Sequence, residues 1–452
     1  MPNLLATSKG RLLFFFLLYI GEGLPQGYTG TVVALEFKRM GMDAEAISAL
    51  MIAVTAPWAW KWLAGPIVDN LHLARFGRRK QWIVGSQILM ILSLLAAMAY
   101  FPEAHAGTYL HLKLFTVLLI INSAFSAIQD VAIDALACGT LEDKERGLGN
   151  GLMFAGAQVG AALGGSVLLV LREKGMSLNS ASMLVPLMLF VLLAMMSFFA
   201  AEKILAVADR PAARGWDQVQ AELKDYGVTV FHAFFGHRQG FLLLLFVLLP
   251  VGGLSLSLTL GTIISPMLGM SDGEIGTMGL WQTLVFCVFC IAGGKISDHF
   301  GRSRCLAVFC IGMSLVTLWA AWELKKSGWS HFATPPVDGK WPVQAGLIRM
   351  WWISGLLYSV FNGLMYGIRT AQIMDFVVPK IAATQFTACM ALINLVTVYS
   401  YAWQGRASDP VSKGGWGWEA WQVFTADAFI GLIFLAILPF LKKREDDSPL
   451  PP

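Results

Sequence analysis

The stretch GPIVD at residues 65–69 runs on to GRRK at 77–80, and it has a counterpart later in the chain. There GKISD at residues 294–298 runs on to GRSR at 301–304. Each passage ends one apolar segment, turns at glycine and arginine, and opens another apolar segment. An aspartate followed by clustered arginines between two membrane spans is energetically costly, so its duplication predicts two related halves.

The composition is that of a protein that crosses the membrane many times. Hydrophobic residues make up 56% of the chain and charged residues 14%, whereas a soluble domain carries about a quarter charged residues. Mean hydropathy is +0.62. The length of 452 residues accommodates about twelve spans of some 20–25 residues with short connections. We therefore predict an all-α membrane protein with about twelve transmembrane helices in two pseudo-symmetric halves of six.

The apolar segments and the charges between them predict domain boundaries and orientation. We expect an N-terminal six-helix half over residues 1–201, a cytoplasmic linker with an amphipathic helix over 202–239, and a C-terminal six-helix half over 240–452. An even number of spans places both termini on one side of the membrane. Roughly nineteen Lys and Arg fall on the terminal side and about eleven on the other, which predicts that both termini are cytoplasmic.

Charge and cysteine content exclude several partners. A net charge of +4 is too small to indicate binding to nucleic acid. Cys287 and Cys290, followed by Cys305 and Cys310, could suggest a metal site. However, the first two lie one helical turn apart in an apolar run, where cysteine acts as a small hydrophobic residue. We predict no metal and no cofactor.

An enzyme is the main alternative from another functional class. A polytopic membrane enzyme acting on a lipid-linked substrate would need an acid–base, metal or nucleophile cluster on a substantial loop. The predicted loops are short and carry no such cluster, so we predict that the chain is not an enzyme. A non-transporting sensor with the same fold is a further alternative, and uptake by proteoliposomes distinguishes both from a transporter.

The first and seventh predicted helices contain glycine and proline at matching depth. Both sites lie about ten residues into their helices, roughly 15 Å or half of the hydrocarbon thickness. Such paired interruptions indicate a binding site near the membrane midplane, although proline and glycine are also common in membrane helices. The predicted breaks are at Gly21, Gly23, Pro25, Pro250, Gly252 and Gly253.

The fifth predicted helix carries glycines at four-residue spacing, at Gly156, Gly160 and Gly164. This spacing places them on one face of the helix and predicts close approach of another helix.

Glu22 and Lys61 fall inside predicted spans, Lys61 in the cytoplasmic third of the second, where a charge costs at least about 2.5–3.5 kcal/mol. Glu22 lies near the midplane between two glycines. It either titrates with the transported proton or contacts substrate, or it stabilises the helix break as a neutral carboxyl. Lys61 lies among tryptophans at 58, 60 and 62. It either extends to the interface along its own stem or faces the cavity, paired with Glu22 or Asp130.

The fourth predicted helix supplies Gln129, Asp130 and Asp134. Residues 130 and 134 share one helix face, so both carboxylates can point in one direction. We expect Gln129 and Asp130 to face the cavity.

The tenth predicted helix offers a partial counterpart in Arg369, Gln372 and Asp375. Arg369 and Asp375 could pair locally, but arginine at this depth is also suited to grip a carboxylate or phosphate.

Together these residues resemble the major facilitator superfamily. Its cytoplasmic motif between the second and third helices, repeated between the eighth and ninth, is similar to the duplicated loop. Within the superfamily the chain resembles the muropeptide permease branch, which includes acetyl-CoA transporters. The matching stretches are GLP at 23–25, WKWLAGPIVD at 60–69, FGRR at 76–79, QD at 129–130, ERGLG at 145–149 and ATQF at 383–386.

The resemblance covers most of the first 165 residues and weakens through helices seven to ten. It implies the major facilitator fold and an inner-membrane importer that works by alternating access and depends on the proton motive force. The implied cargo is a disaccharide-peptide from cell-wall turnover or a similar amphiphilic anionic solute. Relatives carry acetyl-CoA, and some carry siderophores. The expected partners are a small-molecule substrate, protons and the lipid bilayer, with the chain acting as a monomer.

The resemblance also implies a gate at the cytoplasmic ends of the helices. In such transporters an acidic residue at the end of the fourth helix pairs with the arginines of the duplicated loop. This assigns Asp134 to Arg78 or Arg79. The gating residues expected on this basis are Asp69, Arg78, Arg79, Asp134, Asp298 and Arg302.

Overall fold

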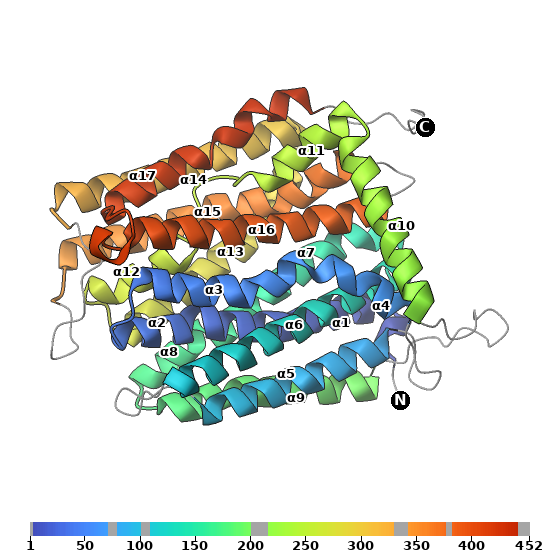
Figure 1. Ribbon diagram of the computed structural model, residues 1–452, viewed down its shortest axis with the longest axis horizontal. Helices are drawn as coiled ribbons and strands as arrows, with labels where there is room; N and C mark the ends of the chain where they lie inside the picture. Colours follow the sequence, from blue (N-terminus) through green and yellow to red (C-terminus); the bar gives the residue numbers. More distant parts are fainter. Residues whose placement is uncertain are drawn as a thin grey trace. The chain divides into compact units, whose positions relative to one another are not determined.

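In the part of the chain that it describes, the computed structural model contains helices joined by turns and irregular segments, and no strands (Figure 1). That part comprises residues 3–70, 79–100, 109–199, 216–329, 342–376 and 382–441, apart from some side chains within the helices. Nine helices in these ranges are long and apolar enough to cross a membrane. There are ten if the bent pair Leu223–Phe235 and Arg238–Leu248 forms one span. This is consistent with the twelve spans expected for the whole chain.

Two helices that carry predicted polar residues are not among the nine. They are α1 (Ser8–Gly27), which holds Glu22, and α15 (Ala345–Phe376), which holds Arg369.

The chain divides into two compact units. Unit 1 comprises Met1–Thr29, Val54–Leu168 and Gly175–Val228. In it α1 packs against α7, and α5 packs against α6 and α9. Fully buried side chains such as Phe15 and Ile133 form its core. The other helices of this unit are α4 (Ala64–Asn70), α5 (Lys80–Ala99), α6 (Tyr109–Thr140), α7 (Asp143–Gly164), α9 (Leu178–Phe199) and most of α10 (Trp216–Phe235).

Unit 2 comprises Gly30–Ala53, Leu169–Lys174 and Thr229–Pro452. Its α13 and α14 both pack against α15, and α17 packs against α14. Its helices are α2 (Ala34–Arg39), the first part of α3 (Ala44–Ala59), the end of α8 (Ser166–Glu173), α11 (Arg238–Leu248), α12 (Thr259–Met267), α13 (Asp272–Phe300), α14 (Arg302–Lys326), α15, α16 (Ala382–Ser408) and α17 (Ala420–Ile430).

The glycines of α7 allow its backbone to contact that of α1, as the four-residue spacing predicts. A methyl group added at Gly156 would lie 2.4 Å from the carbonyl oxygen of Phe16. At Gly160 it would lie 2.2 Å from that of Ile20, and at Gly164 2.0 Å from that of Leu24. Any side chain at these positions would push the helices apart.

The first helix corrects the expectation of a break at Gly21, Gly23 and Pro25. The α-helix runs through all three residues, and a π-helix over Tyr28–Val33 follows it. Such local adjustment is one way in which a membrane helix satisfies backbone groups that proline leaves unpaired. Gly23 serves packing instead, because an added methyl group would lie 2.0 Å from the carbonyl oxygen of Ala157 on α7.

The segment predicted as the seventh helix is interrupted in the structure. Helix α11 ends at Leu248, and residues 249–258 form no regular helix before α12 begins. Gly252 has a φ of +79°, which glycine adopts without strain, and its N–H donates to the carbonyl oxygen of Gly431 at 2.8 Å. The Asp427 carboxylate accepts a hydrogen bond from the backbone N–H of Ser255 at 2.8 Å. The irregular segment is therefore fixed to α17 and the residue that follows it.

Candidate functional site

A buried ion pair lies at the centre of unit 1. The Nζ of Lys61, just after α3, is 2.5 Å from Oδ2 of Asp130 on α6. Their side chains are 8% and 4% exposed. Lys61 also lies over the ring of Trp58, whose indole N–H donates to the hydroxyl of Ser123 at 3.1 Å. Of the two alternatives for Lys61, the structure thus has it paired with Asp130 inside the protein.

Two further carboxyls and a tyrosine lie beside this ion pair. The hydroxyl of Tyr19 on α1 is 2.6 Å from Oδ1 of Asp134 and 3.2 Å from Oδ1 of Asp130. One turn further along α1, Glu22 interacts electrostatically with Asp130, Asp134 and Lys61. Its Oε2 is buried and has no hydrogen-bond partner within the described structure. Three carboxyls therefore interact electrostatically with one ammonium group, which contacts Asp130 directly, and we name Glu22, Lys61, Asp130 and Asp134 the carboxyl cluster.

Gln129 occupies a different face of α6 from Asp130. Its side-chain amide donates to the carbonyl oxygen of Ile83 at 3.1 Å and to the side chain of Gln87 at 2.9 Å. Gln87 in turn donates to the carbonyl oxygen of Leu189 on α9. Successive residues on a helix point in directions about 100° apart. In this structure Gln129 therefore links α5, α6 and α9, and it does not join the carboxyl cluster.

Unit 2 contains a buried arginine. Arg369 on α15 is 7% exposed, and its Nε and Nη2 have no hydrogen-bond partner within the described ranges. One turn later, Gln372 donates to the hydroxyl of Ser303 at 2.8 Å, while its Oε1 is unpartnered in the described structure. The side chain of Asp375, the other predicted partner for Arg369, lies outside the described residues.

The duplicated loop is described only in part. Residue Arg78 and the side chains of Asp69 and Asp298 lie outside the described residues. Arg79 immediately precedes α5, and Arg302 is the first residue of α14. Gly301, between α13 and α14, has a φ of +88°, as the predicted glycine turn requires. The structure places Asp134 against Tyr19, and its expected pairing with Arg78 or Arg79 remains a prediction.

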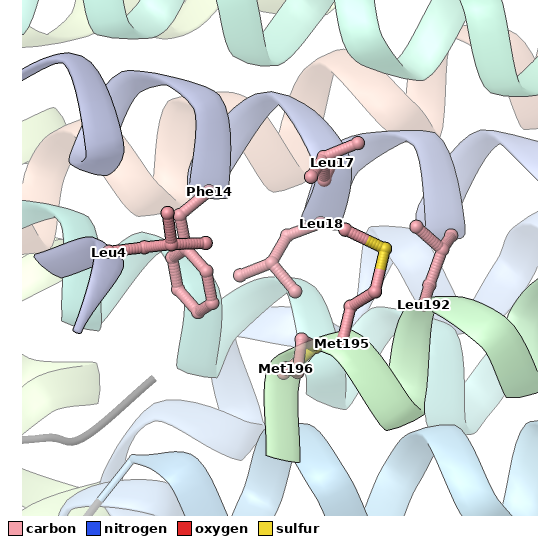
Figure 2. Close-up of a pocket in the computed structure, with 7 residues that line it drawn as sticks. All are labelled: Leu4, Phe14, Leu17, Leu18, Leu192, Met195 and Met196. Atoms are coloured by element: carbon pink, nitrogen blue, oxygen red, sulfur yellow. The ribbon is translucent and has the colours of Figure 1, made fainter. Parts of the chain in front are cut away.

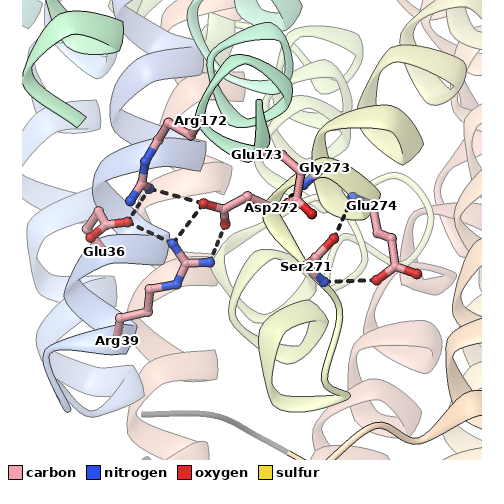
Figure 3. A network of polar contacts seen from close by, with 8 residues as sticks. All are labelled: Glu36, Arg39, Arg172, Glu173, Ser271, Asp272, Gly273 and Glu274. Carbon is pink, nitrogen blue, oxygen red and sulfur yellow. Dashed lines mark hydrogen bonds and ion pairs between the residues drawn. The ribbon is translucent and has the colours of Figure 1, made fainter. Parts of the chain in front are cut away.

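A network of charged residues that no sequence pattern indicated joins three helix ends of unit 2 (Figure 3). Arg39 at the end of α2 contacts Glu36 at 2.9 Å and both carboxylate oxygens of Asp272. Arg172 on α8 contacts Glu36 and is 3.4 Å from Asp272. Asp272 opens α13, where its negative charge also favours the helix N-terminus. We name these four residues the α2–α8–α13 network.

A second group of charges, which we name the α3–α16 cluster, was also missed. Its ion pairs join Lys413 to Asp43 at 3.0 Å and Arg406 to Glu45 at 3.1 Å. Asp409 accepts a hydrogen bond from the backbone N–H of Glu45 at 3.2 Å. Burial, together with the carboxylates of Asp43 and Glu45, raises the pKa of Asp409 to about 6. One feature of the sequence could have indicated this cluster: its acidic and basic residues lie on loops that the predicted topology places on the same side of the membrane.

One small pocket in unit 1 does not fit a polar cargo, because every side chain around it is apolar (Figure 2). It lies between α1 and α9. Its lining residues are Leu4, Phe14, Leu17, Leu18, Leu192, Met195 and Met196.

Comparison with known proteins identifies transporters. A family model described as Major Facilitator Superfamily matches residues 12–400. The anhydromuropeptide permease of Escherichia coli K12 is 25% identical over 448 residues, which cover 95% of this chain and 80% of that protein. A putative transporter named AmpG 4 from Rickettsia felis is 24% identical over 447 residues, covering 96% of this chain and 97% of that protein.

Solved structures agree in fold. The partially occluded, inward-open xylose transporter XylE from E. coli aligns over 96% of this chain and 98% of its own, with a TM-score of 0.65 and 12% identity. A POT family transporter in complex with 5-aminolevulinic acid aligns over 96% of both chains, with a TM-score of 0.66 and 10% identity. The predicted fold class is therefore confirmed. The relatives are multi-pass membrane transporters, in agreement with the prediction that the chain is not an enzyme.

Proposed function

Because the chain belongs to the Major Facilitator Superfamily, we propose that it is a proton-coupled importer working by alternating access. Its cargo is a cell-wall-derived muropeptide or a similar amphiphilic anionic solute. The muropeptide assignment is supported by the anhydromuropeptide permease of E. coli, which resembles this chain along nearly its whole length.

The observation that carries the proton-coupling proposal is the carboxyl cluster. Lys61 neutralises one carboxylate, and with all four groups ionised the cluster holds a net charge of −2. An uncompensated buried charge is strongly destabilising. Binding of one proton removes part of this excess, and Glu22 is the natural acceptor because its Oε2 lacks a donor among the described residues. Interacting carboxyls of this kind take up protons as a group.

The proton and the cargo are then linked by the charge of one site. Entry of an anionic cargo adds negative charge to a protein whose carboxyl cluster already holds an excess, so cargo binding favours proton uptake. Release of the cargo on the other side favours loss of the proton. This reciprocity is sufficient for coupling, because each ligand changes the affinity for the other by the same factor.

The proposed topology has both termini in the cytoplasm of the inner membrane, as the distribution of Lys and Arg favours. The six-helix halves are residues 1–201 and 240–452, joined by the linker 202–239. In this orientation the α2–α8–α13 network and the α3–α16 cluster lie on the outer side of the membrane. The cytoplasmic gate comprises the duplicated loop with Asp134.

The test is uptake by proteoliposomes with and without an imposed pH gradient. The labelled cargoes are a disaccharide-tripeptide muropeptide, acetyl-CoA and a siderophore. We expect the gradient to drive accumulation of the muropeptide. Accumulation of acetyl-CoA or the siderophore alone would replace the cargo assignment, and gradient-independent uptake would contradict proton coupling.

The variant Glu22→Gln tests the proton acceptor. We expect it to lose gradient-driven accumulation and to keep counterflow exchange, since a neutral side chain can permit cargo binding without cycling a proton. The matched control is Glu323→Gln, which makes the same change in a half-buried residue on α14. If Glu22→Gln concentrates cargo as well as the unmodified protein, Glu22 is structural and Asp130 becomes the candidate.

A further inference from the structure

Arg369 differs from the other buried basic residues of the chain. Four basic residues are buried in the described structure: Arg11, Lys38, Lys61 and Arg369. Arg11 pairs with Glu142, Lys61 pairs with Asp130, and Lys38 interacts with Asp43 and Asp409. No carboxylate in the described ranges pairs with Arg369. A buried guanidinium without an anion is energetically costly and persists where a function requires it.

The two unpartnered nitrogens of Arg369 have a specific geometry. Nε and Nη2 lie on the same edge of the guanidinium plane, and their N–H bonds point outward in parallel. That edge matches two oxygens of a carboxylate or phosphate and can bind both at once. Both nitrogens are buried, so bulk water does not compete for them, and neither has an acceptor within the described structure.

The surroundings of Arg369 favour strong binding of an anion. Its neighbours Ile368 and Met365 are almost completely buried in the apolar core of unit 2. In such an environment an ionic hydrogen bond is stronger than at the surface.

We infer that Arg369 binds an oxyanion of the cargo through its Nε–Nη2 edge and thereby selects anionic solutes. This inference rests on the proposed transport function and specifies its substrate class. It also assigns different tasks to two of the buried cations, Lys61 and Arg369. Lys61 is held by Asp130 within the carboxyl cluster, whereas Arg369 is available to the cargo.

The experiment compares a free acid with its neutral ester. The probes are the disaccharide N-acetylglucosaminyl-anhydro-N-acetylmuramic acid and its methyl ester, and binding is measured by calorimetry on purified protein. We expect the unmodified protein to bind the acid about 10–100-fold more tightly than the ester. We expect Arg369→Gln to lose that preference while its affinity for the ester stays unchanged. Arg369→Lys, which keeps the charge but not the paired donors, should be intermediate.

The matched control is Arg349→Gln, because Arg349 is an exposed residue of the same helix. It should bind both probes as the unmodified protein does. Equal loss of acid and ester in Arg369→Gln, or equal affinity for the two probes in the unmodified protein, would overturn the inference. The second comparison does not depend on any variant folding correctly.

A cargo-independent measurement separates this inference from the cargo assignment. Thermal stability is recorded in acetate, phosphate and chloride at constant ionic strength, for the unmodified protein and for Arg369→Gln. If neither disaccharide binds but an oxyanion stabilises only the protein with Arg369, the muropeptide assignment fails and the anion site stands. Acetate against phosphate then distinguishes the two chemistries. If no oxyanion has an Arg369-dependent effect and the acid has no advantage, the inference is wrong.

Discussion

At the residue scale, Lys61 is the cation of the carboxyl cluster. Removing it leaves three buried carboxyls without a compensating charge, whereas removing Asp130 leaves Lys61 with Glu22 and Asp134. We therefore expect Lys61→Met to destabilise the protein by about 3–5 kcal/mol, measured by denaturation in detergent. Asp130→Asn should destabilise it by less. If Asp130→Asn is the less stable of the two variants, Glu22 and Asp134 do not compensate Lys61.

Asp409 predicts a pH dependence that is independent of transport. Its pKa of about 6 in the folded protein lies above the value of about 3.9 for an unfolded chain. The folded protein therefore binds this proton more tightly, and the resulting stability is present at low pH and is lost as pH rises through 6. We expect Asp409→Asn to raise the melting temperature at pH 7.5 by about 2–4 °C and to have little effect at pH 4. If Asp409→Asn changes the melting temperature by the same amount at both pH values, this assignment is wrong.

The residue scale also marks a limit of prediction from sequence. Gln129 and Asp130 are adjacent, and both were expected in the cavity. Only the helix geometry separates them, directing Asp130 to Lys61 and Gln129 to α5 and α9. The pairing of Lys61 with Asp130 was one of two alternatives, because the sequence does not determine whether a lysine side chain points along its helix or across to another.

At the scale of elements, the contact between α1 and α7 can be tested with two glycines of one helix. A methyl group at Gly160 would overlap the backbone of Ile20, whereas one at Gly151 would meet nothing within 4 Å. We expect Gly160→Ala to lower the free energy of unfolding by about 1–3 kcal/mol. Gly151→Ala should be neutral or stabilising by up to about 1 kcal/mol, since alanine favours the helix. Equal effects would mean that helix propensity, not packing, governs both positions.

The elements also show which breaks a sequence can predict. Proline and glycine occur together in the first and seventh helices, but only the seventh is interrupted. There Gly252 adopts a positive φ, and Asp427 on α17 supplies a carboxylate for the buried backbone N–H of Ser255. In α1 the corresponding glycine lies against α7. The same residue type supports a turn or a close contact, and the neighbouring helix decides between them.

At the scale of the whole molecule, the α2–α8–α13 network joins residues from both predicted halves of the sequence. If those halves rock, the ion pairs of Arg39 and Arg172 with Asp272 must separate during each cycle, so their strength biases the equilibrium between states. We expect Asp272→Asn to increase hydrogen exchange in α2 and α8, and the control Asp217→Asn, at an exposed site on α10, to leave it unchanged. High salt should act in the same direction as Asp272→Asn. Unchanged exchange in both conditions would show that the network does not restrain these helices.

The network illustrates what composition and periodicity leave out. Hydropathy predicts that segments cross the membrane, and the duplicated loop predicts two related halves. Neither identifies which helix ends meet, because Arg172 and Asp272 are far in sequence from Glu36 and Arg39 and none of the four belongs to a recognisable motif. The family and the fold were therefore predictable, whereas the ionic contacts at the helix ends required coordinates.

The contact between α1 and α7 has a consequence for variation in this chain. Five glycines on the two helices lie so close to the backbone of the other helix that there is no space for a side chain: Gly23, Gly27, Gly156, Gly160 and Gly164. A saturation mutagenesis library selected for uptake should therefore be depleted of every substitution at these positions, including alanine. These positions should tolerate as few substitutions as the residues of the carboxyl cluster, although the glycines carry no charge and have no side chain that could bind a ligand. Substitutions that abolish uptake will thus occur at close contacts between helices as often as at residues with a chemical role in transport.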